Sequence, residues 1–227
     1  MKISLIPTIA MCGNIVKLEK EVAEIEAAGV DYFHIDVIDG HFAPNLVVGP
    51  NYVKALRSLT KIPMDLHLMV DEPERFVDMF DMQPGEMLSF HYETSRHPFR
   101  FIEELRQKGL RSGITLSPSV TIDQIDELLE HLDFVNVLTI NPGFPGSKII
   151  PAMVKRIGRL RQISDQRGLD LRICVDGSVG YENTPIFLEK GADMLILGYF
   201  CCFGPEGISE SLRKLKSVIS GCGHHTI

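Results

Sequence analysis

The sequence predicts an α/β fold, a (β/α)8 TIM barrel that forms a single domain. Short apolar runs rich in β-branched residues alternate with longer amphipathic stretches along the chain, a pattern typical of parallel strands joined by helices. Eight such pairs occur within 227 residues, which is the size of one closed barrel rather than of two domains. No G-x-G-x-x-G motif follows the first strand, and this argues against an open dinucleotide-binding sheet.

Strands are expected where an apolar run is short and is bounded by turn-forming residues. In chain order, these runs are Ile3–Ile9, Tyr32–Asp36, Met64–Met69, Met87–His91, Arg111–Leu116, Phe134–Leu138, Leu171–Val175 and Met194–Leu197. No linker or charge block interrupts the series. We therefore expect one barrel over residues 1–220, followed by a glycine- and histidine-containing flexible tail over residues 221–227.

Helices are expected between these strands. The clearest is Ile15–Ala28, which has Asn14 as a plausible N-cap and Gly29 as its stop signal. The remaining amphipathic stretches are Asn51–Leu59, Glu74–Met82, Pro98–Lys108, Ile122–His131, Pro151–Arg167, Asn183–Lys190 and Ile208–Ser220.

Charge and composition narrow the range of functions. A formal charge of −7 argues against a general nucleic-acid surface, although a locally positive site for an anionic small molecule remains possible. No apolar run reaches the roughly 20 residues of a membrane helix, and Pro7 breaks the apolar start, so we interpret that start as a buried strand rather than a signal peptide. The five cysteines lack zinc-ribbon or CxxC spacing, which predicts a reducing cytoplasmic location without structural disulfides.

Polar, titratable residues lie at the ends of several predicted strands, where a barrel of this type builds its active site. His34 and Asp36 are two residues apart on one strand face, His67 follows on the next strand, and Asp176 ends the seventh. Two imidazoles and two carboxylates suit Zn²⁺, Mn²⁺, Fe²⁺ or Co²⁺ better than a thiolate-preferring metal or Ca²⁺. The alternative is a set of hydrogen-bonded core residues, but burying four such groups without pairing or a metal would cost several kcal/mol.

Several blocks of sequence carry a family resemblance. Tyr32–Pro44 reads YFHIDVIDGHFAP and resembles the H-x-D-x-M-D-G-x-F-x-P signature of the ribulose-phosphate 3-epimerase family. The blocks Met64–Val70 (MDLHLMV), Asn141–Gly146 (NPGFPG) and Val175–Gly177 (VDG) match in order and spacing. Pro7–Ile9 is similar to the family's P-S-x-L, with Thr8 in place of serine. The resemblance extends from the first to the eighth predicted strand.

The resemblance implies metal-dependent epimerisation at C3 of a ketose phosphate, with D-ribulose 5-phosphate to D-xylulose 5-phosphate as the first expectation. It makes His34, Asp36, His67 and Asp176 the ligands of one divalent ion, Zn, Mn, Fe or Co. It makes Asp36 and Asp176 the catalytic acid and base, acting through a metal-stabilised enediolate. It also implies a homo-oligomer and the substrate-binding residues Thr8, His67, Met69, Gly143, Gly146, Gly177, Ser178 and Gly198.

The three glycine-rich loops that hold phosphate in the family are altered here. Pro145 and Ser147 interrupt the usual P-G-F-G-G-Q, and Pro145 also removes a backbone N–H. Ser178 replaces a glycine, and the bulky Tyr199 follows Gly198 where the family has serine or threonine. Three alternatives stay open at this point: phosphate bound by rearranged loops, another ketose phosphate such as D-allulose 6-phosphate, or an anion other than phosphate.

Two further classes of protein compete with an epimerase. A decarboxylase or aldolase-like barrel needs a lysine inside the barrel, whereas Lys61 and Lys148 fall in predicted loops. A non-catalytic barrel that only binds a sugar phosphate gains nothing from Asp36 and Asp176 facing an anion. We therefore expect an enzyme whose partner is a small-molecule sugar phosphate, without a nucleic-acid or membrane partner.

Overall fold

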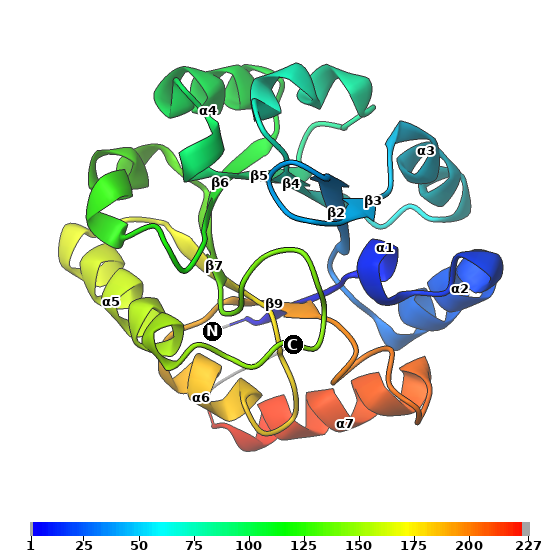
Figure 1. Ribbon diagram of the computed structural model, residues 1–227. Helices are drawn as coiled ribbons and strands as arrows, with labels where there is room; N and C mark the ends of the chain where they lie inside the picture. The colour runs from blue at the N-terminus through cyan, green and yellow to red at the C-terminus, as the bar shows by residue number, and fades with distance from the viewer. Residues whose placement is uncertain (1, 224–227) are drawn as a thin grey trace.

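A computed structural model describes residues 2–223 and contains a barrel of parallel strands ringed by helices (Figure 1). The parallel strands are β1 (Ser4–Pro7), β2 (Phe33–Asp39), β4 (Met64–Met69), β5 (Met87–His91), β6 (Arg111–Leu116), β7 (Phe134–Leu138), β8 (Arg172–Asp176) and β9 (Met194–Leu197). A bridge between Thr8 and His34 joins the first two and closes the barrel. The short strand β3 (Leu46–Val47) pairs antiparallel with the end of β2. The predicted (β/α)8 barrel is confirmed.

The helices of the outer ring are α2 (Leu18–Ala28), α3 (Pro50–Leu59), α4 (Pro98–Gln107), α5 (Pro151–Arg167), α6 (Thr184–Glu189) and α7 (Ile208–Gly221). The short helix α1 (Ile9–Cys12) lies inside this ring, beside β2 (Figure 1). Tighter 3₁₀ turns are η1 (Ile15–Lys17), η2 (Pro73–Arg75), η3 (Val77–Met79), η4 (Tyr92–Thr94) and η5 (Ile122–His131). Asn14 does act as a cap, since its side chain accepts a hydrogen bond from the Val16 amide. Gly29 ends α2 with a φ of +71°, a conformation that favours glycine.

Several predicted elements were wrong in kind or extent. The second strand continues to Asp39, and the predicted helix from Ile15 begins with the 3₁₀ turn Ile15–Lys17. The first strand ends at Pro7, and the chain turns at Thr8 into the short helix α1. The stretches 74–82 and 122–131 form 3₁₀ turns instead of α-helices. Apolar residues three and four positions apart satisfy either helical period over so short a span, so the sequence pattern does not separate the two.

Apolar packing fills the barrel and leaves its mouth polar. One cluster inside the barrel contains Ile6, Met87, Phe134, Cys174, Met194 and Ile196, all at most 2% exposed. Gly113 lies beside the Phe134 ring, and a Cβ on Gly113 would come within 2.3 Å of it. A side chain at this position would therefore displace Phe134 from the core. Buried polar residues, including Ser89, Thr115 and Asn136, lie along the strands that lead to the mouth.

Within residues 2–223, no helix is both long and apolar enough to cross a membrane. Helix α7 includes Gly221, the first residue of the predicted tail, and residues 224–227 lie outside the described part of the chain.

Candidate active site

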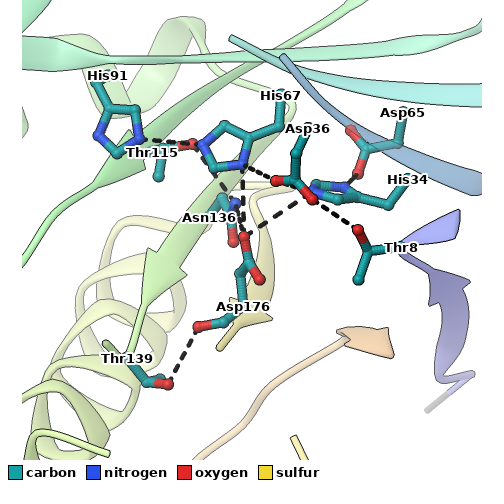
Figure 2. Close-up of polar contacts among 10 residues, drawn as sticks. All are labelled: Thr8, His34, Asp36, Asp65, His67, His91, Thr115, Asn136, Thr139 and Asp176. Carbon is teal, nitrogen blue, oxygen red and sulfur yellow. Dashed lines mark hydrogen bonds and ion pairs between the residues drawn. The ribbon is translucent and has the colours of Figure 1, made fainter. Parts of the chain in front are cut away.

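Strands β2, β4 and β8 bring together four side chains that could hold a metal ion, His34, Asp36, His67 and Asp176, at the barrel mouth (Figure 2). Parallel pairing places Asp36 opposite His67, and the two-residue period of β2 puts His34 on the same inward face as Asp36. Asp176 is the last residue of β8. One ligand atom from each of these four residues lies within 4.8 Å of the others. The residues that the sequence predicted to converge are therefore close enough to hold one ion.

The Asp36 carboxylate lies at the centre of this cluster. Its Oδ1 atom is 3.2 Å from His34 Nε2 and 3.2 Å from His67 Nδ1. Asp176 Oδ2 is 3.9 Å from His34 Nε2 and 3.5 Å from His67 Nδ1. Thr8 Oγ1 donates to the other Asp36 oxygen over 2.6 Å. Each imidazole thus directs one nitrogen towards both carboxylates.

The charges in this cluster depend on one another. Burial alone would lower the pKa of His34, but the carboxylates of Asp36 and Asp65 outweigh it and raise that pKa well above its ordinary value. Burial likewise opposes ionisation of Asp36, yet the facing His34 and His67 hold the pKa of Asp36 far below its usual range. The buried Asp36 carboxylate and the partly buried Asp176 carboxylate therefore need positive charge beside them, either from protons on the imidazoles or from a metal ion.

The donor set fits a metal of the zinc, manganese, iron or cobalt type. It combines imidazole nitrogen with carboxylate oxygen and contains no thiolate. His34 is also held from behind, because its Nδ1 atom lies 2.6 Å from Asp65 Oδ2. A carboxylate in that place orients the ring and makes it a better ligand, as outer partners of metal-bound histidines commonly do.

A cavity open to solvent adjoins this cluster. Asp36 and Asp176 line it, whereas His34 and His67 are completely buried and do not reach its surface. The predicted binding residues that line the same cavity are Thr8, Met69, Gly143, Gly146, Gly177, Ser178 and Gly198. Its wall is mainly apolar and includes Met11, Leu138, Ile140 and Ile196.

Comparison with known proteins agrees with this geometry. The model of the ribulose-phosphate 3 epimerase family matches residues 5–201. The chain belongs to that family. It is 37% identical to the ribulose-phosphate 3-epimerase of Bacillus subtilis, covering 94% of this chain and 98% of the relative. It is 33% identical to the Escherichia coli enzyme of the same name, covering 99% of this chain and 100% of that one.

Solved structures with much lower sequence identity share the fold. KGPDC from Streptococcus mutans aligns with a TM-score of 0.70 at 12% identity, over 97% of this chain and 99% of that chain. A mutant tryptophan synthase α-subunit from Pyrococcus furiosus aligns with a TM-score of 0.65 at 13% identity, over 96% and 98% of the two chains. Both likenesses concern the barrel architecture alone.

The part of the cavity lined by residues 141–146, 177–179 and 198–200 is formed by loops rather than strands. Within residues 2–223, the amides of Gly177, Ser178 and Gly198 donate no hydrogen bond to the protein. Ser178 adopts a positive φ of 52°, and its hydroxyl donates to the Ser147 carbonyl, which joins two of the altered loops. Tyr199 is 53% exposed and lines the cavity at its rim.

Four residues with side-chain contacts to this site were missing from the predicted site. Asp65 pairs with His34, and His91 lies 3.1 Å from His67. Asn136 lies 3.5 Å from Asp176 Oδ2, and Asn45 donates to the Gly143 carbonyl over 2.8 Å. Asp65 shares a strand face with His67, and His91 ends its own strand. Position on a strand would therefore have nominated both, but their partners depend on how neighbouring strands align.

Proposed function

We propose that this chain is a metal-dependent isomerase that epimerises C3 of a ketose phosphate and interconverts D-ribulose 5-phosphate and D-xylulose 5-phosphate. The observation that carries the proposal is the pair Asp36 and Asp176 on the floor of the cavity, each in reach of both buried histidines. Membership of the ribulose-phosphate 3-epimerase family supports the same reaction.

Two opposed carboxylates suit the inversion of a carbon next to a carbonyl. Such an inversion removes a proton from one face and returns a proton to the other. Asp36 comes from β2 and Asp176 from β8, which are separated in the sheet by β1 and β9. We assign one carboxylate to each face of the substrate, so the substrate need not turn over between the two proton transfers.

Each carboxylate has a neutral hydrogen-bonding neighbour that orients it. The Thr8 hydroxyl donates to Asp36 Oδ2, and the Asn136 amide lies 3.5 Å from Asp176 Oδ2. The low pKa of Asp36 keeps it ionised and ready to accept a proton, but also makes it a weak base. A divalent ion held by His34, Asp36, His67 and Asp176 would supply Lewis-acid polarisation of the substrate's carbonyl and hydroxyl oxygens, which acidifies C3.

The rest of the cavity supports a sugar phosphate. Met69, Met11 and Leu138 form an apolar wall that keeps water from the carbon under attack. The unpaired amides of Gly177, Ser178 and Gly198 provide donors for phosphate oxygens, the usual way in which barrels of this kind bind phosphate. Gly177, Ser178 and Gly198 line the cavity together with Pro145 and Tyr199, and we assign phosphate as the anion that these amides bind.

The test is turnover of the two candidate substrates. Purified protein supplied with Mn²⁺, Co²⁺ or Zn²⁺ is assayed with D-ribulose 5-phosphate and with D-allulose 6-phosphate, and exchange of the C3 hydrogen is followed in D₂O. We expect faster turnover of the pentose phosphate, with solvent deuterium entering at C3. Asp176→Asn, which keeps the side-chain volume, should abolish both signals in a folded protein. No turnover of either sugar by metal-loaded protein would reject the proposal.

Three further expectations accompany this function. We expect a cytoplasmic location, in keeping with five free cysteines among the described residues. We also expect residues 1–220 to fold as one unit and the protein to form a homo-oligomer. Light scattering with limited proteolysis measures both the assembly and the extent of the folded unit.

A further inference from the structure

We infer that His91, with Glu93 behind it, is a positioning residue that sets which nitrogen of His67 carries a proton and leaves His67 Nδ1 free to bind the metal. The inference rests on the metal site of the proposed function, and it gives a role to a buried histidine outside the ligand set. His91 ends strand β5 and is 0% exposed.

The geometry places His91 directly behind His67, on the side away from the carboxylates (Figure 2). Nε2 of His91 lies 3.1 Å from Nε2 of His67, and the two rings are stacked with centroids 5.1 Å apart. The other nitrogen of His67, Nδ1, faces Asp36 and Asp176 at 3.2 Å and 3.5 Å. His91 therefore contacts the ring nitrogen that points away from the metal position.

One proton decides which nitrogen of His67 can bind metal. Two neutral imidazole nitrogens 3.1 Å apart form a hydrogen bond only if one carries the proton and the other accepts it. If His67 Nε2 carries the proton, Nδ1 keeps a free lone pair and can bind an ion. If His91 Nε2 carries it, the proton of neutral His67 must be on Nδ1, which then cannot act as a ligand.

Glu93 favours the arrangement that binds metal. Its Oε1 atom lies 3.7 Å from His91 Nδ1 and accepts a hydrogen bond from the Ser117 hydroxyl. Among residues 2–223, the buried His91 Nδ1 has no partner within hydrogen-bond distance, which leaves it free to direct a proton towards Glu93. A carboxylate near this nitrogen favours a proton on it, and that leaves His91 Nε2 as the acceptor for His67.

His34 and His67 are thus oriented by different means. His34 has a carboxylate, Asp65, directly behind its ring, at the nitrogen that faces away from Asp36. On the corresponding side of His67, the nearest partner is His91, and the Glu93 carboxylate lies beyond it. Both arrangements place an acceptor behind a candidate metal ligand, and outer partners of this kind typically change metal affinity by about 10–100-fold.

The test measures Co²⁺ binding to metal-free protein in competition with a chelator, together with the visible spectrum of the cobalt form. His91→Phe keeps a ring that packs on Phe42, whose centroid is 4.3 Å from His91, but it removes the acceptor. We expect its cobalt dissociation constant to rise about 10–100-fold with an altered spectrum. His91→Gln has an oxygen that can reach His67 and should stay within about threefold of the parent.

A second pair of variants covers the case in which His91→Phe does not fold. Glu93→Ala should weaken cobalt binding. Glu93→Gln keeps an acceptor oxygen and should bind cobalt nearly as tightly as the parent. Phe90→Leu is the matched control, because Phe90 is a buried neighbour on β5 that packs outwards against Phe101, and it should leave the dissociation constant unchanged.

The outcomes separate this inference from the proposed function. Unchanged cobalt affinity and spectrum in folded His91→Phe, or in Glu93→Ala, would overturn the inference even if the parent epimerises its substrate. A parent that binds cobalt but turns over neither sugar would reject the proposed function. The role of His91 would still be decided by the cobalt dissociation constants of its variants. A parent that binds no cobalt would overturn both.

Discussion

The metal end and the anion end of the cavity differ in how their residues are held. His34 and His67 are completely buried on neighbouring strands, and each has a polar partner behind its ring. At the other end, Phe144 and Tyr199 are 51% and 53% exposed, and the donors are backbone amides of loops. Strand positions are constrained by the barrel ladder, whereas loop positions tolerate substitution. This explains why the departures from the family pattern gather at the anion end.

The largest expected effect comes from the metal end. Asp36→Asn removes a ligand and one of the two acid–base groups, so kcat should fall by at least about 10³-fold. Thr8→Val, which removes only the hydroxyl that donates to Asp36, should cause a much smaller loss. Steady-state kinetics with a circular dichroism check of folding measures both. An Asp36→Asn variant within tenfold of the parent would exclude Asp36 from the chemistry.

A glycine at the anion end should matter next. Gly177 has a φ of +95°, and an added Cβ would lie 2.7 Å from Ile140 Cγ1. Gly177→Ala combines a strained backbone with overpacking and should cost about 3 kcal/mol of unfolding free energy, and KM should rise. Gly146→Ala is the matched control, since its φ is +84° but nothing lies within 4 Å of the added Cβ. It should cost only about 1 kcal/mol.

Equal losses of stability in the two glycine variants, measured by urea denaturation, would show that crowding against Ile140 is unimportant. The residues around Gly177 would then accommodate an added Cβ as easily as those around Gly146.

Replacing Tyr199, at the same end of the cavity, is expected to improve substrate binding. Tyr199→Ser restores the small hydroxyl residue of the family pattern beside the Gly198 amide. One additional hydrogen bond to the phosphate should lower KM for D-ribulose 5-phosphate by about threefold to tenfold, without changing kcat. A higher KM would mean that the tyrosine itself contributes to binding and that the substrate differs from the pentose phosphate.

The smallest effect concerns the loop that links the two ends. Asp39 accepts hydrogen bonds from the amides of His41, Phe42 and Asp71, and these outweigh the opposing effect of burial, so the pKa of Asp39 is lowered from 3.8. A lowered pKa in the folded state stabilises the protein above the unfolded pKa, and this contribution disappears as pH falls through the folded value. Solvent screening keeps the contribution small.

Asp39→Asn should therefore reduce the unfolding free energy at neutral pH and lessen its decline below about pH 4. Urea denaturation of both proteins across that range measures the difference. A parallel decline in the two proteins would assign the acid sensitivity to other carboxylates.

The sequence alone determined the barrel class and the approach of His34, Asp36, His67 and Asp176 to one another. Alternation within a strand is a local property, so His34 and Asp36 could be placed on one face without knowledge of their neighbours. Position at the ends of successive parallel strands then predicted their approach to His67 and Asp176, and the observed 4.8 Å limit agrees.

Tertiary structure decided what lies behind and around that cluster. Asp65 pairs with His34, and His91 with His67, only because of the lateral alignment of β2, β4 and β5, which no single strand encodes. Residues 74–82 and 122–131 became 3₁₀ turns because packing on the barrel selected between two periods that the sequence satisfies equally. Loop conformation placed Tyr199 at the rim, since the path of a loop depends on contacts with distant segments rather than on local periodicity.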